Sequence, residues 1–196
     1  MRALRELTAD DLAYYAFKAM TTFGDAEDFK HFLPRLCELL TDELLGVSFP
    51  INDELLGQKI RYADYPQWPD DERAALRDFL MAGWRAVLAQ YPFPNADTQL
   101  CLIAQCEDEL TPYLAAWLAI QTPTALAHLA AYVATAPQSA WWDERPDQRR
   151  QVEDFLSAPA LNDSLALLAY RFRDQLPPDL DPRITGMLRD LAHALE

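Results

Sequence analysis

The sequence predicts an all-α protein, a single helical domain over residues 1–196, with about eight to ten short helices. Three observations predict this fold class. Apolar residues recur at helical spacing along most of the chain. The fourteen prolines lie mostly between these apolar stretches, and only five glycines are present. No linker rich in glycine or serine divides the chain. We expect the helices to pack as antiparallel hairpins, in a bundle or with slight superhelical curvature.

The first helices are predicted from their caps. Thr8 precedes a helix over 9–21, and Asp25 precedes a second one that ends near Leu44. Side-chain oxygens at these positions accept hydrogen bonds from the free N–H groups of the first helical turn. Pro34 has no N–H and is expected to divide the second helix into a short and a longer piece.

The next segment contains the clearest amphipathic pattern. Asn52 begins a helix over 53–62, and a longer helix is predicted over 69–90, where three acids, Asp70 to Glu72, suit the dipole of a first turn. Only Val47 to Ile51 has the character of a strand, and it lacks a partner strand.

The remaining helices are marked by cap and proline pairs. Thr111-Pro112, Thr122-Pro123 and Asp181-Pro182 each place a capping oxygen before a proline at the first helical position. Asp97 is expected to begin another helix. Two further helices are predicted over 147–157 and 163–176.

Composition excludes several classes of partner and indicates a compartment. Thirty-one acidic residues against seventeen basic ones give a formal net charge of −14. Nucleic-acid binding and docking on anionic lipid both rely on lysine and arginine, so we expect neither nucleic acid nor membrane as a partner. The chain has no signal-peptide pattern, and its three cysteines form no C-x-x-C pair. We expect a cytoplasmic, bacterial protein with free thiols.

Most common catalytic machinery is missing from the sequence. The scattered glycines do not form a phosphate-binding loop, and no serine lies in G-x-S-x-G. The three histidines are too dispersed for H-E-x-x-H, and three cysteines do not make a four-cysteine zinc site. We expect no cofactor, no metal and no catalytic residue, and the sequence favours a non-enzymatic protein.

The densest polar segment runs TTFGDAEDFKHFLPR over 21–35. It resembles a motif shared by an uncharacterised family of bacterial all-helical proteins: Thr-Thr, an aromatic, Gly-Asp, then Asp, an aromatic, a base and His-Phe-Leu-Pro-Arg. The resemblance implies a helical fold and no particular activity.

Two interpretations of this segment remain open. In the structural one, which we favour, Asp25 caps a helix and Asp28 holds His31 or Arg35. In the other, Asp28 and His31 share a helix face and hydrogen-bond or hold a metal together. The alternative catalytic or metal-binding site comprises Thr21, Thr22, Asp25, Asp28, His31 and Arg35.

Tryptophan and acidic side chains indicate a partner-binding surface. Trp141 and Trp142 are adjacent in a predicted loop, so one ring is expected to fill the core and the other to stand at the surface. We assign Trp142 as the exposed anchor, because tryptophan is enriched at binding hot spots and acids beside it suit a basic partner. Closure of the bundle end by both rings is the alternative. The predicted surface comprises Trp141, Trp142, Asp143, Glu144, Glu107, Asp108 and Glu109.

Three functions are consistent with these patterns. The first is an acidic protein that binds a basic partner, for instance an inhibitor of the immunity or antitoxin type. The second is an enzyme or metal protein centred on the polar site of residues 21–35. The third is a self-associating scaffold, because the segment 110–142 carries no Asp, Glu, Lys or Arg and suits either the innermost helix pair or a homodimer interface. His128, within this segment, is expected to be a hydrogen-bonded core residue.

Overall fold

The computed structural model describes residues 2–44, 53–92, 95–135 and 137–195. Within these ranges the chain forms α-helices and short 3₁₀-helices and no strand, which confirms the all-α prediction. The possible strand at 47–51 lies outside the described residues.

The first five α-helices are α1 (Ala9–Lys18), α2 (Ala26–Leu44), α3 (Asp53–Tyr62), α4 (Asp70–Leu88) and α5 (Ala96–Cys106). The next five are α6 (Thr111–Ala119), α7 (Pro123–Thr135), α8 (Pro146–Ser157), α9 (Pro159–Phe172) and α10 (Pro182–His193). The 3₁₀-helices are η1 (Leu4–Glu6), η2 (Tyr65–Gln67) and η3 (Ala140–Glu144).

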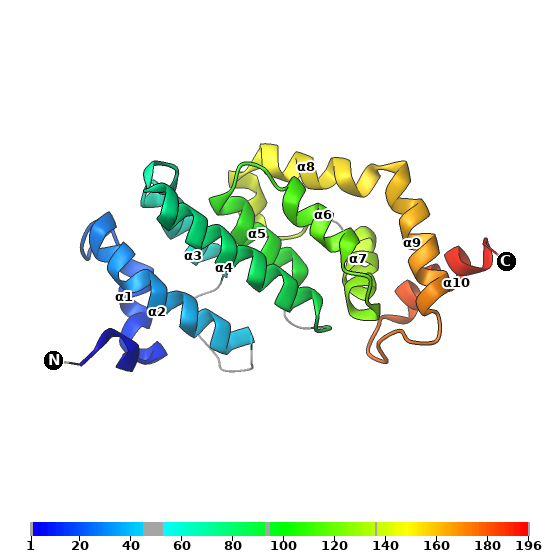
Figure 1. The fold of residues 1–196 in the computed structure, drawn as a ribbon, viewed down its shortest axis with the longest axis horizontal. Helices are drawn as coiled ribbons and strands as arrows, with labels where there is room; N and C mark the ends of the chain where they lie inside the picture. Colours follow the sequence, from blue (N-terminus) through cyan, green and yellow to red (C-terminus); the bar gives the residue numbers. More distant parts are fainter. Residues whose placement is uncertain (1, 45–52, 93–94, 136, 196) are drawn as a thin grey trace.

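From α1 to α7 the helices follow one another along the long axis of an elongated molecule, and the chain then returns to α5, so that α8 runs above α6 toward α9 (Figure 1). The two termini lie at opposite ends, with α1 and α2 near the N-terminus and α9 and α10 near the C-terminus. In the view of Figure 1, α2 and α4 run side by side in the same direction, and Lys30 of α2 forms an ion pair with Glu72 of α4.

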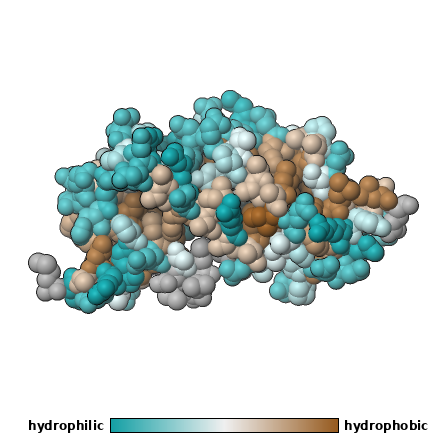
Figure 2. Space-filling model, in the orientation of Figure 1, coloured by the Kyte–Doolittle hydropathy of each residue, from teal (hydrophilic) through white to brown (hydrophobic). Residues whose placement is uncertain are grey.

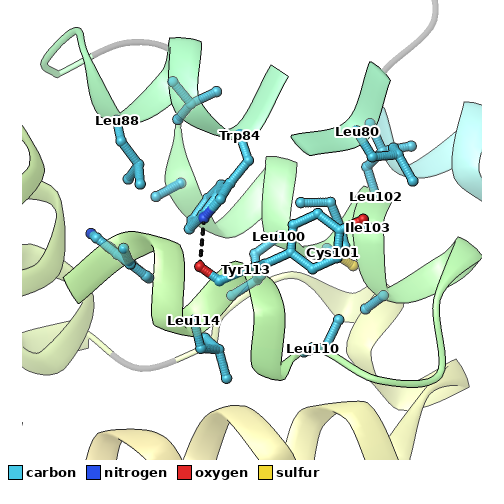
Figure 3. Packing of buried hydrophobic residues seen from close by; sticks show 14 of the residues in the cluster. Leu80, Trp84, Leu88, Leu100, Cys101, Leu102, Ile103, Leu110, Tyr113 and Leu114 are labelled. Atoms are coloured by element: carbon cyan, nitrogen blue, oxygen red, sulfur yellow. Dashed lines mark hydrogen bonds between the residues drawn. The ribbon is translucent and has the colours of Figure 1, made fainter. Parts of the chain in front are cut away.

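Helix α5 is the centre of the core. Every residue from Ala96 to Cys106 except Thr98 is buried, so this helix has no exposed polar face. Leu80 of α4 lies beside Ile103, and the indole N–H of Trp84 donates to the Tyr113 carbonyl at 2.9 Å (Figure 3). This bond gives the only polar group of the fully buried Trp84 ring an acceptor. The apolar area of the ring therefore stabilises the core without leaving a buried donor unpaired.

A glycine permits the close contact between α3 and α5. A Cβ atom added at Gly57 would lie 2.8 Å from the Gln105 Cβ and 2.9 Å from the Leu102 carbonyl oxygen. The second of these is backbone and has no freedom to move away. Any larger residue at position 57 would therefore push α3 off the central helix.

Several predicted helix starts are confirmed and others are wrong. Thr8, Asp25 and Asp181 accept backbone N–H bonds of the following first turns as expected. Thr122 accepts from the Ala125 N–H. Thr111 is itself the first residue of α6, and no side chain caps that helix.

Three helices differ from the sequence prediction. Helix α1 ends at Lys18 rather than at residue 21. Helix α2 runs unbroken through Pro34, whose ring is exposed, because the buried side chains on its other face hold both halves against the core. Helix α9 spans 159–172 rather than 163–176. Pro159 begins it, and the chain turns directly after Phe172, where the Gln175 N–H donates to the Phe172 carbonyl.

Candidate functional site

Trp142 is a core residue, which corrects its assignment as the exposed anchor. Its side chain is 0% exposed, and its indole N–H donates to Asp97 Oδ1 at 2.9 Å. Trp141 is the half-buried ring of the pair, and its backbone carbonyl accepts from the Gln105 side chain at 3.2 Å. Within the 3₁₀-helix η3, Trp142 is the buried residue, so its ring is not available to a partner.

Asp97 accepts hydrogen bonds from four donors and does not begin α5. Asn95 caps that helix, through its side chain and the Asp97 N–H. Asp97 Oδ1 accepts from the Tyr132 hydroxyl as well as from Trp142, both at 2.9 Å. Its Oδ2 accepts from the backbone N–H groups of Gln138 and Ser139. This one carboxylate therefore fixes the segment between α7 and η3.

The acids of the predicted partner surface pair with arginines of the same chain. Asp108 contacts Arg145 at 2.7 Å, and Asp143 contacts Arg149 at 3.1 Å. Glu144 binds Arg61 of α3, at 2.5 Å. The pair Asp108–Arg145 brings the 107–109 and 141–145 segments together, as one predicted surface requires. The three arginines already balance much of the negative charge of that surface.

Glu107 is also partly internal. It is half-buried and accepts a hydrogen bond from the Tyr65 hydroxyl at 2.9 Å. Burial raises the pKa of Glu107, and the bond from Tyr65 opposes that rise. Its neighbour Glu109 is exposed. Of the three acids in this run, Glu107 therefore stabilises the junction with η2 more than it charges the surface.

The polar segment of residues 21–35 forms helix caps. Asp25 Oδ1 accepts from the Glu27 and Asp28 N–H groups, and Asp28 Oδ2 accepts from the Asp25 N–H at 3.2 Å. Asp28 thus holds the backbone of Asp25, and the expected contact with His31 or Arg35 is wrong. His31 is exposed and lies against Phe32.

The other members of that segment are also engaged locally. Arg35 donates to the Leu7 carbonyl at 2.8 Å and pairs with Glu38. The Thr21 hydroxyl donates to the Lys18 carbonyl, and Thr22 lies exposed in the same turn. Among the described residues no group of three or more His, Cys, Asp or Glu side chains is placed to hold a metal. The contacts of these side chains are those of helix caps and local ion pairs, and a catalytic role for the alternative site stays untested.

Two histidines form hydrogen bonds with backbone carbonyls of this chain. His128 is buried on α7, its Nε2 bonds to the Gln90 carbonyl, and the ring of Tyr91 lies against it. Burial lowers the pKa of His128, and bonds to backbone carbonyls oppose this in part. His193, at the end of α10, bonds to the Arg189 carbonyl. His128 is the hydrogen-bonded core residue that the sequence predicts.

The apolar segment 110–142 contributes mainly to the core. Leu114 and Trp117 of α6 are buried, as is the whole run from Ala125 to Ala130 in α7. Their packing partners lie in this chain, where Trp117 stacks edge-on against Trp84. No helix in the described ranges has the length and apolar character to span a membrane.

An apolar groove between α2 and α4 was missed by the sequence analysis. Its volume is about 560 Å³, and Leu33, Cys37, Trp68 and Leu76 form the buried part of its wall. Phe79 is half-buried there. Figure 2 shows apolar surface emerging between the hydrophilic helices in this half of the molecule. Each wall has the pattern of an ordinary core face, so only the spacing of two helices in the fold creates the groove.

The rim of this groove carries an excess of acid. Lys30 is the one cation along the described walls, and it pairs with Glu72 at 2.7 Å and with Glu27 at 3.2 Å. Its ammonium also lies over the Trp68 ring. Glu38 stands on the α2 rim. Burial raises the pKa of Cys37 to about 12, so its thiol stays protonated and acts as an apolar wall.

Neither a protein-family model, nor a curated protein, nor a solved structure matches this chain. The resemblance of residues 21–35 to a bacterial helical family therefore stays a prediction.

Proposed function

We propose that this chain is an acidic, cytoplasmic protein-binding protein that holds an apolar helix of a basic partner in the groove between α2 and α4. The groove is the observation that carries the proposal. It joins an apolar wall to an acidic rim, and an amphipathic helix with basic flanks has the complementary pattern. Inhibition of that partner, as by immunity or antitoxin proteins, is the finer part of the proposal.

The shape and composition of the groove suit this mode of recognition. An amphipathic helix binds by laying side chains spaced three and four residues apart into an apolar channel. Both walls here are helices of 19 residues, so the groove follows extended, rigid edges. Trp68 and Phe79 offer ring surface to such side chains, and aromatic groups contribute strongly to binding hot spots.

Charge adds speed and selectivity to the same contact. With a formal net charge of −14, the chain attracts cationic proteins from a distance and repels acidic ones. The acids Glu27, Glu38 and Glu72 outnumber the two cations with which they pair, Lys30 and Arg35, so an incoming lysine or arginine meets an excess of acid rather than an uncompensated cation. The partner's basic residues therefore belong on the flanks of its apolar face.

Two matched variants test the groove. Ala75 is exposed and lines the groove, whereas Ala74 is exposed on the same helix and lies outside it. Ala75→Arg fills the groove with a long cationic side chain, and Ala74→Arg makes the same change of charge beside it. The probe is a synthetic amphipathic helical peptide of leucine and lysine, with binding followed by tryptophan fluorescence.

We expect Ala75→Arg to weaken peptide binding at least tenfold, about 1.4 kcal/mol, and Ala74→Arg to leave it nearly unchanged. Equal effects of the two variants would show that the peptide responds to net charge alone, and the groove would lose its assigned role. For the inhibitory part, a basic enzyme captured on the full chain should lose its activity with one equivalent of wild type and keep it with Ala75→Arg.

A further inference from the structure

A second, polar cavity of about 510 Å³ lies among α3, α5, α7 and the residues that lead into η3. Asp97 and Tyr132 line its interior, and the exposed residues Asn95 and Gln138 line its mouth. Its size is within the range of pockets that hold small organic ligands. It is separate from the α2–α4 groove, with which it shares no residue.

Glu54, at the start of α3, is one of the residues that line this cavity, and one of its carboxylate oxygens has no hydrogen-bond partner. The residue is 7% exposed. Its Oε1 accepts a hydrogen bond from the Ser139 hydroxyl at 3.2 Å. Its Oε2 is buried and has no hydrogen-bond partner. A buried acceptor left unpaired is unfavourable, more so when it is charged, so a bound donor would recover that energy.

Two other polar side chains of the cavity, Asp97 and His128, already have hydrogen-bond partners. Both oxygens of Asp97 accept hydrogen bonds, and Nε2 of His128 bonds to the Gln90 carbonyl. No lysine or arginine is present among the described residues that line the cavity. The cavity therefore combines two carboxyl groups with no cation, and Glu54 Oε2 is its unpaired acceptor.

The size and walls of the cavity select the type of cation. A metal ion such as Mg²⁺ or Ca²⁺ needs about six to eight oxygen ligands, which the described residues do not bring together. The volume is many times that of a single ion or water, whose share is about 30 Å³. Tyr91 and Tyr132 supply aromatic wall, which attracts organic cations through the ring face.

We propose that this cavity binds a small organic cation, a primary ammonium or a guanidinium on an apolar body. The cationic N–H groups donate to Glu54 Oε2, and the apolar body lies against Tyr91 and Tyr132. The site acts independently of the protein-binding groove.

Calorimetric titration of the full chain with butylammonium, tyramine and agmatine tests the proposal. Tyrosol, which replaces the ammonium of tyramine with a neutral hydroxyl, is the ligand control. Glu54→Gln removes the charge without changing the shape of the side chain. Glu144→Gln is the protein control, because Glu144 also contacts α3, through Gln58, but lies outside the cavity.

We expect at least one of the three cations to bind with one-to-one stoichiometry and to raise the melting temperature of the wild type. Affinity should fall at least tenfold in Glu54→Gln and stay within twofold in Glu144→Gln. Circular dichroism of Glu54→Gln should match the wild type, since a neutral amide relieves a buried charge. Equal binding of tyramine and tyrosol, equal binding by both variants, or no binding of any of the three cations would each overturn the proposal.

Discussion

Asp97 is the residue whose loss should be felt most widely. Replacing it with alanine leaves the Trp142 indole, the Tyr132 hydroxyl and two backbone N–H groups without an acceptor. We expect Asp97→Ala to lower the free energy of unfolding by about 3 kcal/mol or more, measured by urea denaturation. Asp147→Ala is the control. It removes an exposed carboxylate paired with Arg150 and should cost less than about 1 kcal/mol. Similar losses for the two variants would contradict the role given to Asp97.

His128 should make stability depend on pH in a definite direction. Burial lowers its pKa in the folded protein below the usual 6.5. As the pH falls, the unfolded chain therefore binds the proton at a higher pH than the folded protein does. Stability from the neutral ring is complete above about pH 6.5 and is lost as pH falls toward the folded pKa. Relative to His128→Gln, the wild type should lose up to about 1.4 kcal/mol per pH unit in that window. Urea denaturation of both proteins at pH 7.5 and 5.5 measures this difference, and parallel profiles would contradict the expectation.

The single residues that sequence reasoning placed correctly are those with local partners. Thr8, Asp25 and Asp181 bond to N–H groups two or three residues away, so their roles follow from a short window of sequence. Asp97 and Trp142 are 45 residues apart, and nothing in either local pattern indicates the other. The same limit hid Glu54, whose burial depends on α5 and on Ser139.

Among the helices, α2 should gain stability when its proline is removed. Pro34 leaves the Lys30 carbonyl without the N–H donor that a regular helix supplies. Pro34→Ala restores that donor, and we expect the free energy of unfolding to rise by about 2 kcal/mol, allowing for the extra freedom of the unfolded chain. Thermal and urea denaturation measure the change. An unchanged or lower stability would show that the proline fits α2 without cost.

The sequence predicted helices better than their surfaces. The amphipathic pattern of α4 and the cap of α10 are strong local signals, and both helices lie where they were expected. The start of α9 at Pro159 was missed, although a proline at a first helical position was the signal that located α10. The groove was beyond sequence reasoning, because its two walls belong to separate helices and neither pattern indicates the gap between them.

At the scale of the whole molecule, net charge should govern how fast a partner arrives. The Debye length falls from about 10 Å at 0.1 M salt to about 3 Å at 1 M, which screens attraction between exposed charges. We expect the association rate of a basic partner to fall about tenfold or more across this range. The dissociation rate should change far less, because the groove contact is apolar. Stopped-flow measurements at the two salt concentrations separate the rates, and a dissociation rate that carries most of the salt effect would contradict steering by charge.

The links between α3 and η3 also bear on the order in which the protein acquires its structure during synthesis. Arg61 is bound to Glu144, 83 residues later, and Glu54 to Ser139, 85 residues later. A nascent chain emerges from the ribosome N-terminal end first, and contacts distant in sequence form late. Until residues 138–144 have emerged, α3 lacks these partners and the Asp97 carboxylate lacks three of its four donors. The central layer of the fold is therefore completed only after about three quarters of the chain has been made.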